Sequence, residues 1–320
     1  MTADANQKIR LGISSCLLGY KVRYDGDDKL EHFLTDTIGQ YVEWVPVCPE
    51  VESGLSVPRE AMRLVGAVDD PRLVTIRTGV DHTDRIKTWA SKKMTYLNGL
   101  DLCGFVFKSR SPSSGMRGVK VSIETGKIST TGSGIFAKAF LDHFPHLPAE
   151  DEERLHDPSI RENFIERVFV YQRWQDYRRQ DGSLGGLIAF HTGHKYLIMA
   201  HSQKHSIALG KMVAGAKSGS RKEILDRYIA TLMAGLSLIA TVKKNTNVLQ
   251  HMAGYFKKSL CADEKKELES SIGNYHDHLV PLIVPITLLK HFVRKYQVAY
   301  LAGQIYLSPH PLEIMLRNHV

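Results

Sequence analysis

Cysteine is scarce in this sequence, at four residues in 320. Four cysteines are too few for a disulfide framework in a chain of this length, and no two of them form a Cys-x-x-Cys pair. The sequence therefore gives no support for a zinc ribbon or a thioredoxin-type redox site. In a reducing compartment the cysteines are expected to be free, metal-bound or catalytic. Cys261, in a predicted helical region, is expected to be structural.

Long apolar runs are also missing. No uninterrupted run approaches the ~20 residues that span a bilayer, and the first residues lack the basic and apolar stretches of a secretory signal. Neither a Gly-x-x-x-x-Gly-Lys phosphate loop nor a Ser-His-Asp signature is present. We therefore expect a cytoplasmic protein without a membrane partner, and no pattern points to an obligate protein partner.

The excess of positive charge is confined to the second half of the chain. Residues 1–150 hold 19 Lys and Arg against 18 Asp and Glu, whereas the remaining residues hold 23 against 16. From Leu187 onward there are 17 basic and 8 acidic residues. A nearly neutral half joined to a basic half predicts a catalytic unit carried by a polyanion-binding unit. The alternative is that the basic residues only solvate the helices.

Hydrophobic periodicity indicates an α/β part followed by an all-helical part. In the first part apolar strands alternate with helical patterns, which is typical of an open, mostly parallel sheet with flanking helices. The predicted strands are Ile9–Ser14, Val42–Val47, Val74–Arg77, Gly104–Lys108 and Lys120–Ile123, with helices at 84–97 and from Gly134 to before Pro145.

The second part is predicted to be helical almost throughout. Its segments are 159–179, 184–202, 204–216, 219–242, 244–261, 263–275, 281–303 and 310–317. We place an α/β domain at 1–148 and an all-α domain at 159–320. The acidic, proline-punctuated residues 145–157 are the predicted linker between them.

Three short turns follow predicted strands and carry reactive side chains. Cys16 lies in the first, Cys48 opens the second, and the third runs from Ser109 to Gly115. Ligands of an open α/β sheet collect beyond the carboxyl ends of the strands, so the three turns are predicted to meet there. Thiolates near helix N-termini and basic residues are expected to have a lowered pKa and to ligate metal or attack a substrate. The alternative is that both are buried packing cysteines.

Polar residues in these turns are suited to moving protons and binding a substrate. Glu50 lies two residues after Cys48, where a carboxylate can transfer protons, although it can equally be a helix cap or a surface acid. In the third turn, hydroxyl and N–H groups predict a nest for an anion or a carbonyl, with a solvated turn as the alternative. The polar side chains of this turn, together with the lysine just before it, are Lys108, Ser109, Arg110, Ser111, Ser113 and Ser114.

Histidine and lysine cluster in the helical half. His191, His194 and Lys195 share one predicted helix face, and a second cluster comprises His201, Lys204 and His205. No carboxylate or cysteine joins them, so contact with phosphates fits the charge balance better than a zinc site. A solvated helix face remains the alternative for each residue.

Taken together, the motifs resemble one family. The run from Ser14 to Gly26, Cys48-Pro49-Glu50 with Pro58-Arg59, and the run from Lys108 to Gly115 look like the iron–sulfur thiouracil desulfidase (TudS-like) domain. Residues 190–202, 247–258 and 309–311 resemble the YbgA-like helical domain that often follows it. The resemblance covers essentially the whole chain.

This resemblance implies a tRNA desulfidase that converts 4-thiouridine to uridine. In such proteins three cysteines hold a [4Fe–4S] cluster, and its open iron takes the thiocarbonyl sulfur while water replaces that sulfur. Cys16 and Cys48 match two ligands, and Glu50 and Ser111 match the proton-handling and substrate-orienting positions. Ser113 is a further candidate catalytic residue. The helical domain would position a thiouridine-containing tRNA. The residues predicted to bind this RNA are His194, Lys195, His201, Lys204, Lys257 and Lys258.

The sequence departs from the family pattern at the third ligand. Ser114 stands where the family has cysteine, so the ligand is either lost, replaced by the serine oxygen, or replaced by Cys103. Cys103 precedes the predicted strand Gly104–Lys108. The length of that strand places the Cys103 sulfur roughly 17–20 Å from the strand's carboxyl end, where the reactive turns are predicted to meet. We expect a site that keeps its architecture, with Ser114 in the ligand position. The competing functions are an RNA-binding homologue with impaired catalysis and a desulfidase of free thiouracil bases.

Overall fold

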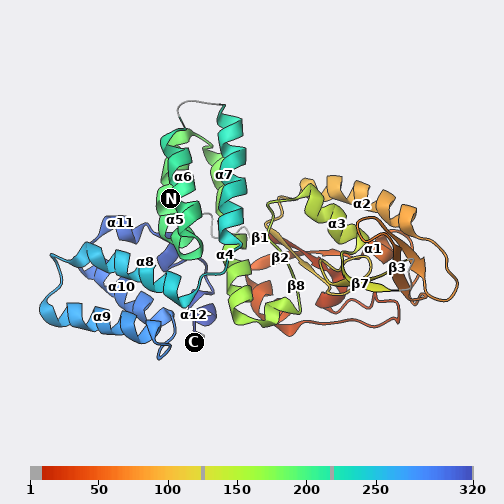
Figure 1. The fold of residues 1–320 in the computed structure, drawn as a ribbon, viewed down its shortest axis with the longest axis horizontal. Coiled ribbons are helices and arrows are strands. Elements are labelled where there is room, and N and C mark those ends of the chain that lie inside the picture. Colours follow the sequence, from red (N-terminus) through yellow and green to blue (C-terminus); the bar gives the residue numbers. More distant parts are fainter. Residues whose placement is uncertain (1–8, 124–126, 217–219, 319–320) are drawn as a thin grey trace. The chain divides into compact units, whose positions relative to one another are not determined.

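The computed structural model describes residues 9–123, 127–216 and 220–318. The chain divides into two compact units, Met1–His156 and Asp157–Val320, and Figure 1 shows that the first is a mixed α/β unit and the second is helical. The predicted fold class is therefore confirmed.

A parallel four-stranded sheet organises the first unit. Its order is β2-β1-β5-β8, and the strands are β1 (Ile9–Ser14), β2 (Val42–Val47), β5 (Gly104–Phe107) and β8 (Ala149–Asp151). Ser14 pairs with Val47 across β1 and β2, and Phe107 pairs with Asp151 across β5 and β8. The carboxyl ends of all four strands thus lie at one edge, which is where the predicted reactive turns begin.

A second sheet of four strands completes the β structure of the first unit. Its order is β4-β3-β6-β7, formed by β4 (Pro71–Thr75), β3 (Met62–Gly66), β6 (Val119–Ser122) and β7 (Ile128–Gly132). Only β3 and β6 pair in parallel. The sequence pattern predicted strands near β4 and β6 but not β3 and β7, in which Leu64 and Gly132 are the only buried residues.

Helices α2 (Thr83–Asn98) and α3 (Ile135–His143) cover the sheets, as Figure 1 shows, and confirm the two predicted helices. The core at this contact is aromatic: Phe105 and Phe107 of β5 pack against Phe136 and Phe140 of α3. Gly12 of β1 lies under Phe105, where an added Cβ would stand 2.1 Å from the ring. Glycine is required at this position because the ring occupies the space of a side chain.

The predicted linker is instead part of the first unit. Residues 149–151 form β8, and the acidic side chains of Glu150, Asp151 and Glu152 are all buried. Arg117 and Arg154 pair with Glu150, and Lys108 pairs with Glu152. Acidic composition indicated a solvated segment, but ion pairs with basic residues, of which Lys108 and Arg117 are distant in the sequence, make its burial possible.

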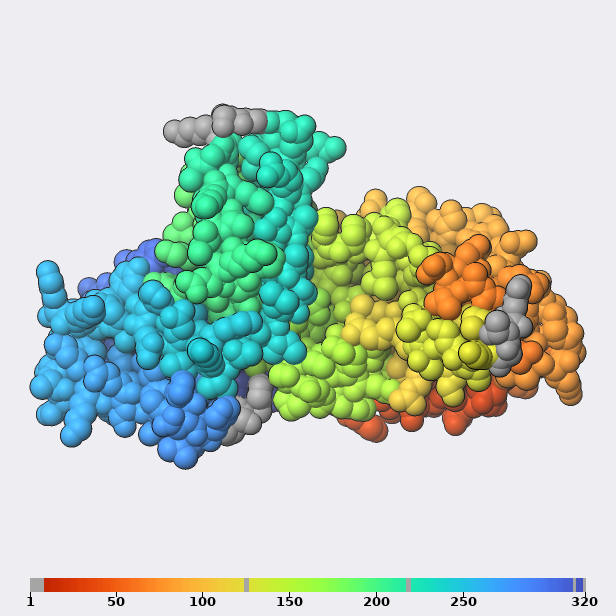
Figure 2. Space-filling view, viewed as in Figure 1, coloured from red at the N-terminus to blue at the C-terminus, as the bar shows by residue number. Residues whose placement is uncertain are grey.

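The second unit consists of helices around one apolar core. They are α4 (Pro158–Gln180), α5 (Leu184–His201), α6 (Gln203–Ala214), α7 (Arg221–Leu236), α8 (Val242–Ala253), α9 (Ala262–His276), α10 (Ile283–Lys295), α11 (Ala299–Ala302) and α12 (Glu313–Leu316). The predicted helix at 281–303 is in fact two helices, because the chain turns between α10 and α11. Figure 2 shows the side chains of α6 and α7 packed against each other on the visible face.

The core of this unit includes Trp174, Tyr228, Leu232 and Phe256. Within the described residues, none of the helices has the length and apolar content needed to cross a bilayer.

Candidate functional site

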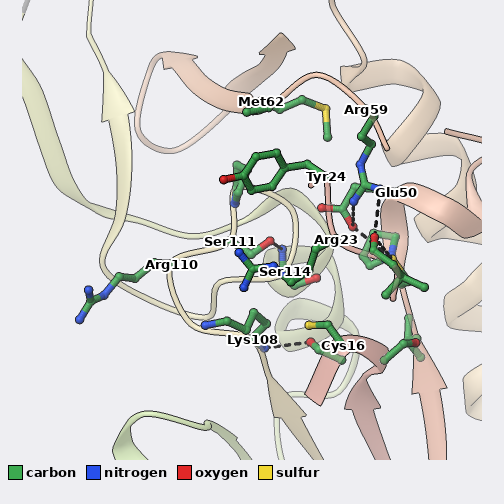
Figure 3. A pocket seen from close by; sticks show the side chains of 18 of the residues that line it. Cys16, Arg23, Tyr24, Glu50, Arg59, Met62, Lys108, Arg110, Ser111 and Ser114 are labelled. Carbon is green, nitrogen blue, oxygen red and sulfur yellow. Dashed lines mark hydrogen bonds and ion pairs between the residues drawn. The ribbon is translucent and has the colours of Figure 1, made fainter. Parts of the chain in front are cut away.

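A cavity of about 380 Å³ opens at the carboxyl edge of the parallel sheet. The turns after β1, β2 and β5 supply most of its wall, and the segment leading into β3 supplies the rest. Figure 3 shows Cys16, Glu50, Lys108, Ser111 and Ser114 arranged around this space. The predicted convergence of the three turns is therefore what the fold produces.

Cys16 lies in a 3₁₀ turn, Ser15–Leu18, which continues directly from β1. The turn ends at Gly19, whose φ of 85° is in the left-handed region that favours glycine. Cys16 is buried, and burial raises the pKa of its thiol to about 11 even though the Lys108 cation acts in the opposite direction. The expected lowering of this pKa is therefore wrong, because desolvation of the thiolate outweighs the nearby positive charge.

Cys48 stands at the N-cap of the short helix α1 (Pro49–Glu52). Its backbone N–H donates to Glu52 Oε1 at 2.9 Å, and its Sγ lies 3.5 Å from Glu50 Oε2. Burial, together with the Glu50 carboxylate, raises the pKa of the Cys48 thiol to about 12. Burial thus favours the neutral thiol at both cysteines, so their conversion to thiolates depends on ligation of a metal.

Glu50 is the acidic group of the cavity, and it is buried. Ser113 Oγ donates to Glu50 Oε1 at 2.6 Å, and an Arg59 nitrogen lies 3.9 Å from Glu50 Oε2. Arg59 also donates to the carbonyl of Val22 at 3.0 Å, which fixes the guanidinium beside the carboxylate. A carboxylate held by a hydroxyl and a cation, 3.5 Å from a thiol, is suited to proton transfer inside the cavity.

The serine turn is held together by its own side chains. Ser111 Oγ lies 3.1 Å from Ser113 Oγ and accepts from the Ser114 backbone N–H at 3.1 Å. Ser113 Oγ and Ser114 Oγ are 3.3 Å apart. Ser111 and Ser114 line the cavity, whereas Ser113 is fully buried behind them and contacts Glu50. The three hydroxyls and Glu50 therefore form one connected network.

The acidic segment that ends at Glu153 supports this wall, a role that its composition did not predict. Glu152, just after β8, pairs with Lys108 Nζ and accepts from the Ser109 N–H at 2.6 Å and the Ser109 hydroxyl at 2.9 Å. It therefore fixes the start of the serine turn and places a lysine in the cavity wall. The sequence feature that could have indicated this role is an acidic run directly after a short apolar segment. Judged by composition alone, such a run is interpreted as a linker.

The cavity offers two sulfur donors for a metal cofactor, Cys16 and Cys48, and the Ser114 oxygen lines it at the predicted third position. Sulfur donors favour iron–sulfur clusters. Cys103 is excluded as a third ligand, because it lies at the opposite end of β5. There its backbone N–H donates to the Arg10 carbonyl, and its Sγ contacts the carbonyl of Asp101. In the described part of the chain, no three His, Cys, Asp or Glu side chains form a metal-binding group. The residues thus fit a cluster at two positions, with a serine oxygen at the third.

The predicted RNA-binding residues of the second unit fall into two groups. Lys195, Lys204, Lys257 and Lys258 are exposed. His194 is buried, with Nδ1 2.7 Å from the carbonyl oxygen of Phe190.

His201 is also buried, with Nε2 2.9 Å from Glu166 Oε2. Neither histidine is available to an RNA on the surface, which corrects that part of the prediction. The spacing of these histidines was that of a helix face, but this face packs into the core.

Comparison with known proteins gives a match for each unit. Residues 11–152 match the family described as 2-thiouracil desulfurase, and residues 195–311 match a family described as a protein of unknown function, DUF1722. YbgA of Escherichia coli (strain K12) is 29% identical over 153 residues, covering 48% of this chain and 90% of YbgA. YbbK of Bacillus subtilis (strain 168) is 30% identical over 133 residues, covering 39% of this chain and 85% of YbbK. A solved structure of the [4Fe-4S]-dependent thiouracil desulfidase TudS is 28% identical, with a TM-score of 0.39, over 47% of this chain and 95% of that chain.

Proposed function

Through residues 11–152 the chain belongs to the 2-thiouracil desulfurase family, and we propose that its first unit removes sulfur from a thiolated uracil. The observation that carries this proposal is the single cavity in which two thiols, a buried glutamate and a serine network meet. The resemblance inferred from the motifs is confirmed for both units, since YbgA matches the second.

We propose that the cavity holds a [4Fe–4S] cluster through Cys16, Cys48 and the Ser114 oxygen. When bound, the cluster supplies a Lewis-acidic iron that has no protein ligand and accepts the thiocarbonyl sulfur. The two thiols lose their protons when they ligate the metal, and the Lys108 cation beside Cys16 favours this charge. Ser114 provides a harder donor than cysteine, so we expect this chain to hold its cluster less tightly than a three-cysteine site.

The chain's own residues supply the proton transfers of the reaction. Replacing C=S by C=O consumes one water and releases hydrogen sulfide, with no net transfer of electrons. Glu50 removes a proton from the attacking water and returns it to the departing sulfur, and its hydrogen bond from Ser113 and its pairing with Arg59 fix its position. Ser111, on the cavity wall, orients the polar edge of the uracil ring.

We propose thiouridine in tRNA as the substrate, because the unit that contains this cavity is followed in the chain by a basic helical unit. From Leu187 onward basic residues outnumber acidic ones by 17 to 8, and the exposed lysines at 195, 204, 257 and 258 are suited to phosphate contacts. A free thiouracil base needs none of these charges. The serine at the third ligand position favours one further alternative, an RNA-binding homologue with impaired catalysis.

Substitution of Ser114 by cysteine tests the function and the cofactor together. Parent and Ser114→Cys proteins are purified anaerobically, and iron content, visible absorption and sulfide release from 4-thiouridine tRNA and from 2-thiouracil are measured. We expect a brown parent that releases sulfide from tRNA, and a variant with higher iron retention, because a thiolate binds iron more strongly than a hydroxyl. Cys103→Ser, at the far end of β5, is the matched control and should behave like the parent.

The outcomes separate the candidate functions. Parent protein that stays colourless after reconstitution and releases no sulfide, while the Ser114→Cys variant gains both properties, identifies an impaired homologue. Sulfide release from 2-thiouracil but not from tRNA identifies a free-base enzyme. If both proteins stay colourless and inactive on both substrates, the proposed function is wrong.

A further inference from the structure

A second large hollow lies in the helical unit, between α5 and α6, with a volume of about 900 Å³. Its floor is apolar and includes Ile188, Met199 and Ile207. Ile188 and Ile207 are each about half exposed, at 51% and 54%. Apolar side chains of this size left in solvent along one groove indicate a surface that is covered by a ligand.

The groove is bounded by a stack of aromatic rings. Tyr300 of α11 lines it, and the ring of Tyr255 lies on the ring of Tyr300 with centroids 5.3 Å apart and planes inclined by 15°. Tyr196 of α5 supports Tyr300 edge-on, at 6.4 Å and 74°. Tyr255 is 46% exposed, while the next residue, Phe256, is fully buried among core aromatics. The buried phenylalanine therefore anchors the turn that presents Tyr255 to solvent.

A cation and hydrogen-bonding groups complete the wall of the groove. Lys195 lines it and is exposed, and His191 lies one helical turn earlier on the same face of α5. Burial and the Lys195 cation lower the pKa of His191, and its Nδ1 lies 3.1 Å from the Tyr228 hydroxyl. The groove thus combines an apolar floor, a flat aromatic side, one positive charge and few polar groups.

We propose that this groove binds an unpaired nucleotide of an RNA ligand, with its base against Tyr300 and its phosphate on Lys195. The inference rests on the proposed function in that the RNA is its substrate. Aromatic rings bind unpaired bases through their faces, and this stacking accepts any base because every base has a π-face. The net positive charge of the helical unit favours a polyanion over an apolar peptide or a second copy of this chain.

The size of the groove agrees with one nucleotide rather than a duplex. Pockets for small ligands occupy roughly 300–1,000 Å³, and this groove, at about 900 Å³, lies within that range. A paired base has both faces covered by its neighbours and cannot lie against Tyr300. The groove should therefore select single-stranded or looped RNA.

The test uses the full chain and a short single-stranded RNA that carries one 2-aminopurine and a terminal fluorophore. Anisotropy reports affinity, and 2-aminopurine fluorescence reports stacking. Tyr300→Leu should weaken binding roughly 5- to 140-fold and remove the 2-aminopurine signal, since it deletes the aromatic face. Tyr300→Phe keeps that face and should bind like the parent. Lys195→Gln should lower the slope of log Kd against log salt by about one.

Tyr96→Leu is the matched control, because Tyr96 is 56% exposed beside Lys93 on α2 of the first unit. It should change neither signal, and circular dichroism checks that every variant is folded. The proposal is overturned if Tyr300→Leu binds with the parent's affinity and signal, or if a blunt RNA duplex binds as tightly as the single strand. It is also overturned if the parent is a dimer that Ile207→Glu dissociates, since a second copy then fills the groove.

This result is independent of the desulfidase assay. A parent that releases no sulfide but stacks on 2-aminopurine would refute the proposed reaction and support the groove. If the parent releases sulfide from tRNA, and Tyr300→Leu changes neither this release nor the RNA affinity, the proposed reaction is supported and the groove is refuted as an RNA site.

Discussion

At the scale of the residue, the surroundings of each side chain in the cavity decide its chemistry. Cys16 and Cys48 follow strands in the manner of activated thiols, yet burial holds their pKa values at about 11 and 12. Glu50 is the one acidic side chain among the residues that line the cavity. A hydroxyl, a guanidinium and a thiol surround it. Proton transfer in the reaction therefore depends on this carboxylate.

Glu50→Gln should reduce sulfide release roughly 10²- to 10⁴-fold, the usual contribution of general acid–base catalysis. The amide preserves the shape of the side chain but cannot take a proton, so iron content and unfolding midpoint should stay near those of the parent. Steady-state sulfide release is the measurement. Glu43→Gln, an exposed carboxylate on β2 paired with Arg10, is the matched control and should retain full activity. Full activity of Glu50→Gln would remove Glu50 from the mechanism.

At the scale of the element, the N-terminus of α3 holds the serine turn in place. The N–H groups of Phe136 and Ala137 donate to the Ser113 carbonyl at 2.9 and 3.3 Å, and the Gly134 N–H donates to Gly115 at 2.8 Å. Gly134 approaches the turn so closely that an added Cβ would stand 2.4 Å from the Ser113 carbonyl carbon. The close contact of α3 with the turn thus sets the position of Ser113 and, through it, of Glu50.

Gly134→Ala should destabilise the first unit by about 1–3 kcal/mol, the typical cost of inserting a methyl group into a packed contact. It should also lower sulfide release, because Ser113 moves away from Glu50. Urea unfolding and the sulfide assay measure the two effects. Gly99→Ala, at the end of α2, is the control, because its added Cβ would lie 3.5 Å from the nearest atom. It should change neither the unfolding midpoint nor the rate of sulfide release. An unchanged unfolding midpoint for Gly134→Ala would contradict the close contact.

The strands and helices that could be predicted are those with a strong local pattern. β1 and β2 agree with the predicted ranges at both ends, because they are short apolar runs bounded by turn residues. β8 was missed: it has only three residues, two of them acidic, and their burial depends on Arg117 and Arg154 from outside the strand. A sequence window around β8 contains Arg154, four residues after Glu150, but not Arg117.

At the scale of the whole molecule, buried histidines should make the stability of the helical unit depend on pH. Among the buried histidines of the helical unit, burial lowers the pKa values of His194 and His310 to about 3 and about 4 from an ordinary 6.5. Both are therefore neutral in the folded state and take up protons on unfolding once the pH falls below about 6.5. Their contribution to stability is complete above that value and is lost as the pH falls toward 3.

The helical unit should therefore lose stability between pH 6.5 and pH 4. Hydrogen–deuterium exchange of peptides from α5 and α8 measures its free energy of opening separately from that of the first unit. His310→Gln should flatten this pH dependence, because one titrating group is removed, whatever its effect on absolute stability. His276→Gln, whose side chain is exposed beside Asp277, should leave the dependence unchanged. Equal pH dependence of the parent and His310→Gln would contradict the assignment.

The sequence by itself determined which residues meet at the cavity. Strand periodicity and the turns that end each strand are local properties, and parallel strands bring their carboxyl ends to one edge, so Cys16, Cys48 and the serine turn had to converge. Tertiary structure alone decided which of these groups are shielded from water. Desolvation is the sum of contributions from residues far apart in the chain. For that reason the protonated thiols, the burial of His194 and His201, and the docking of β8 beside β5 are properties of the folded chain.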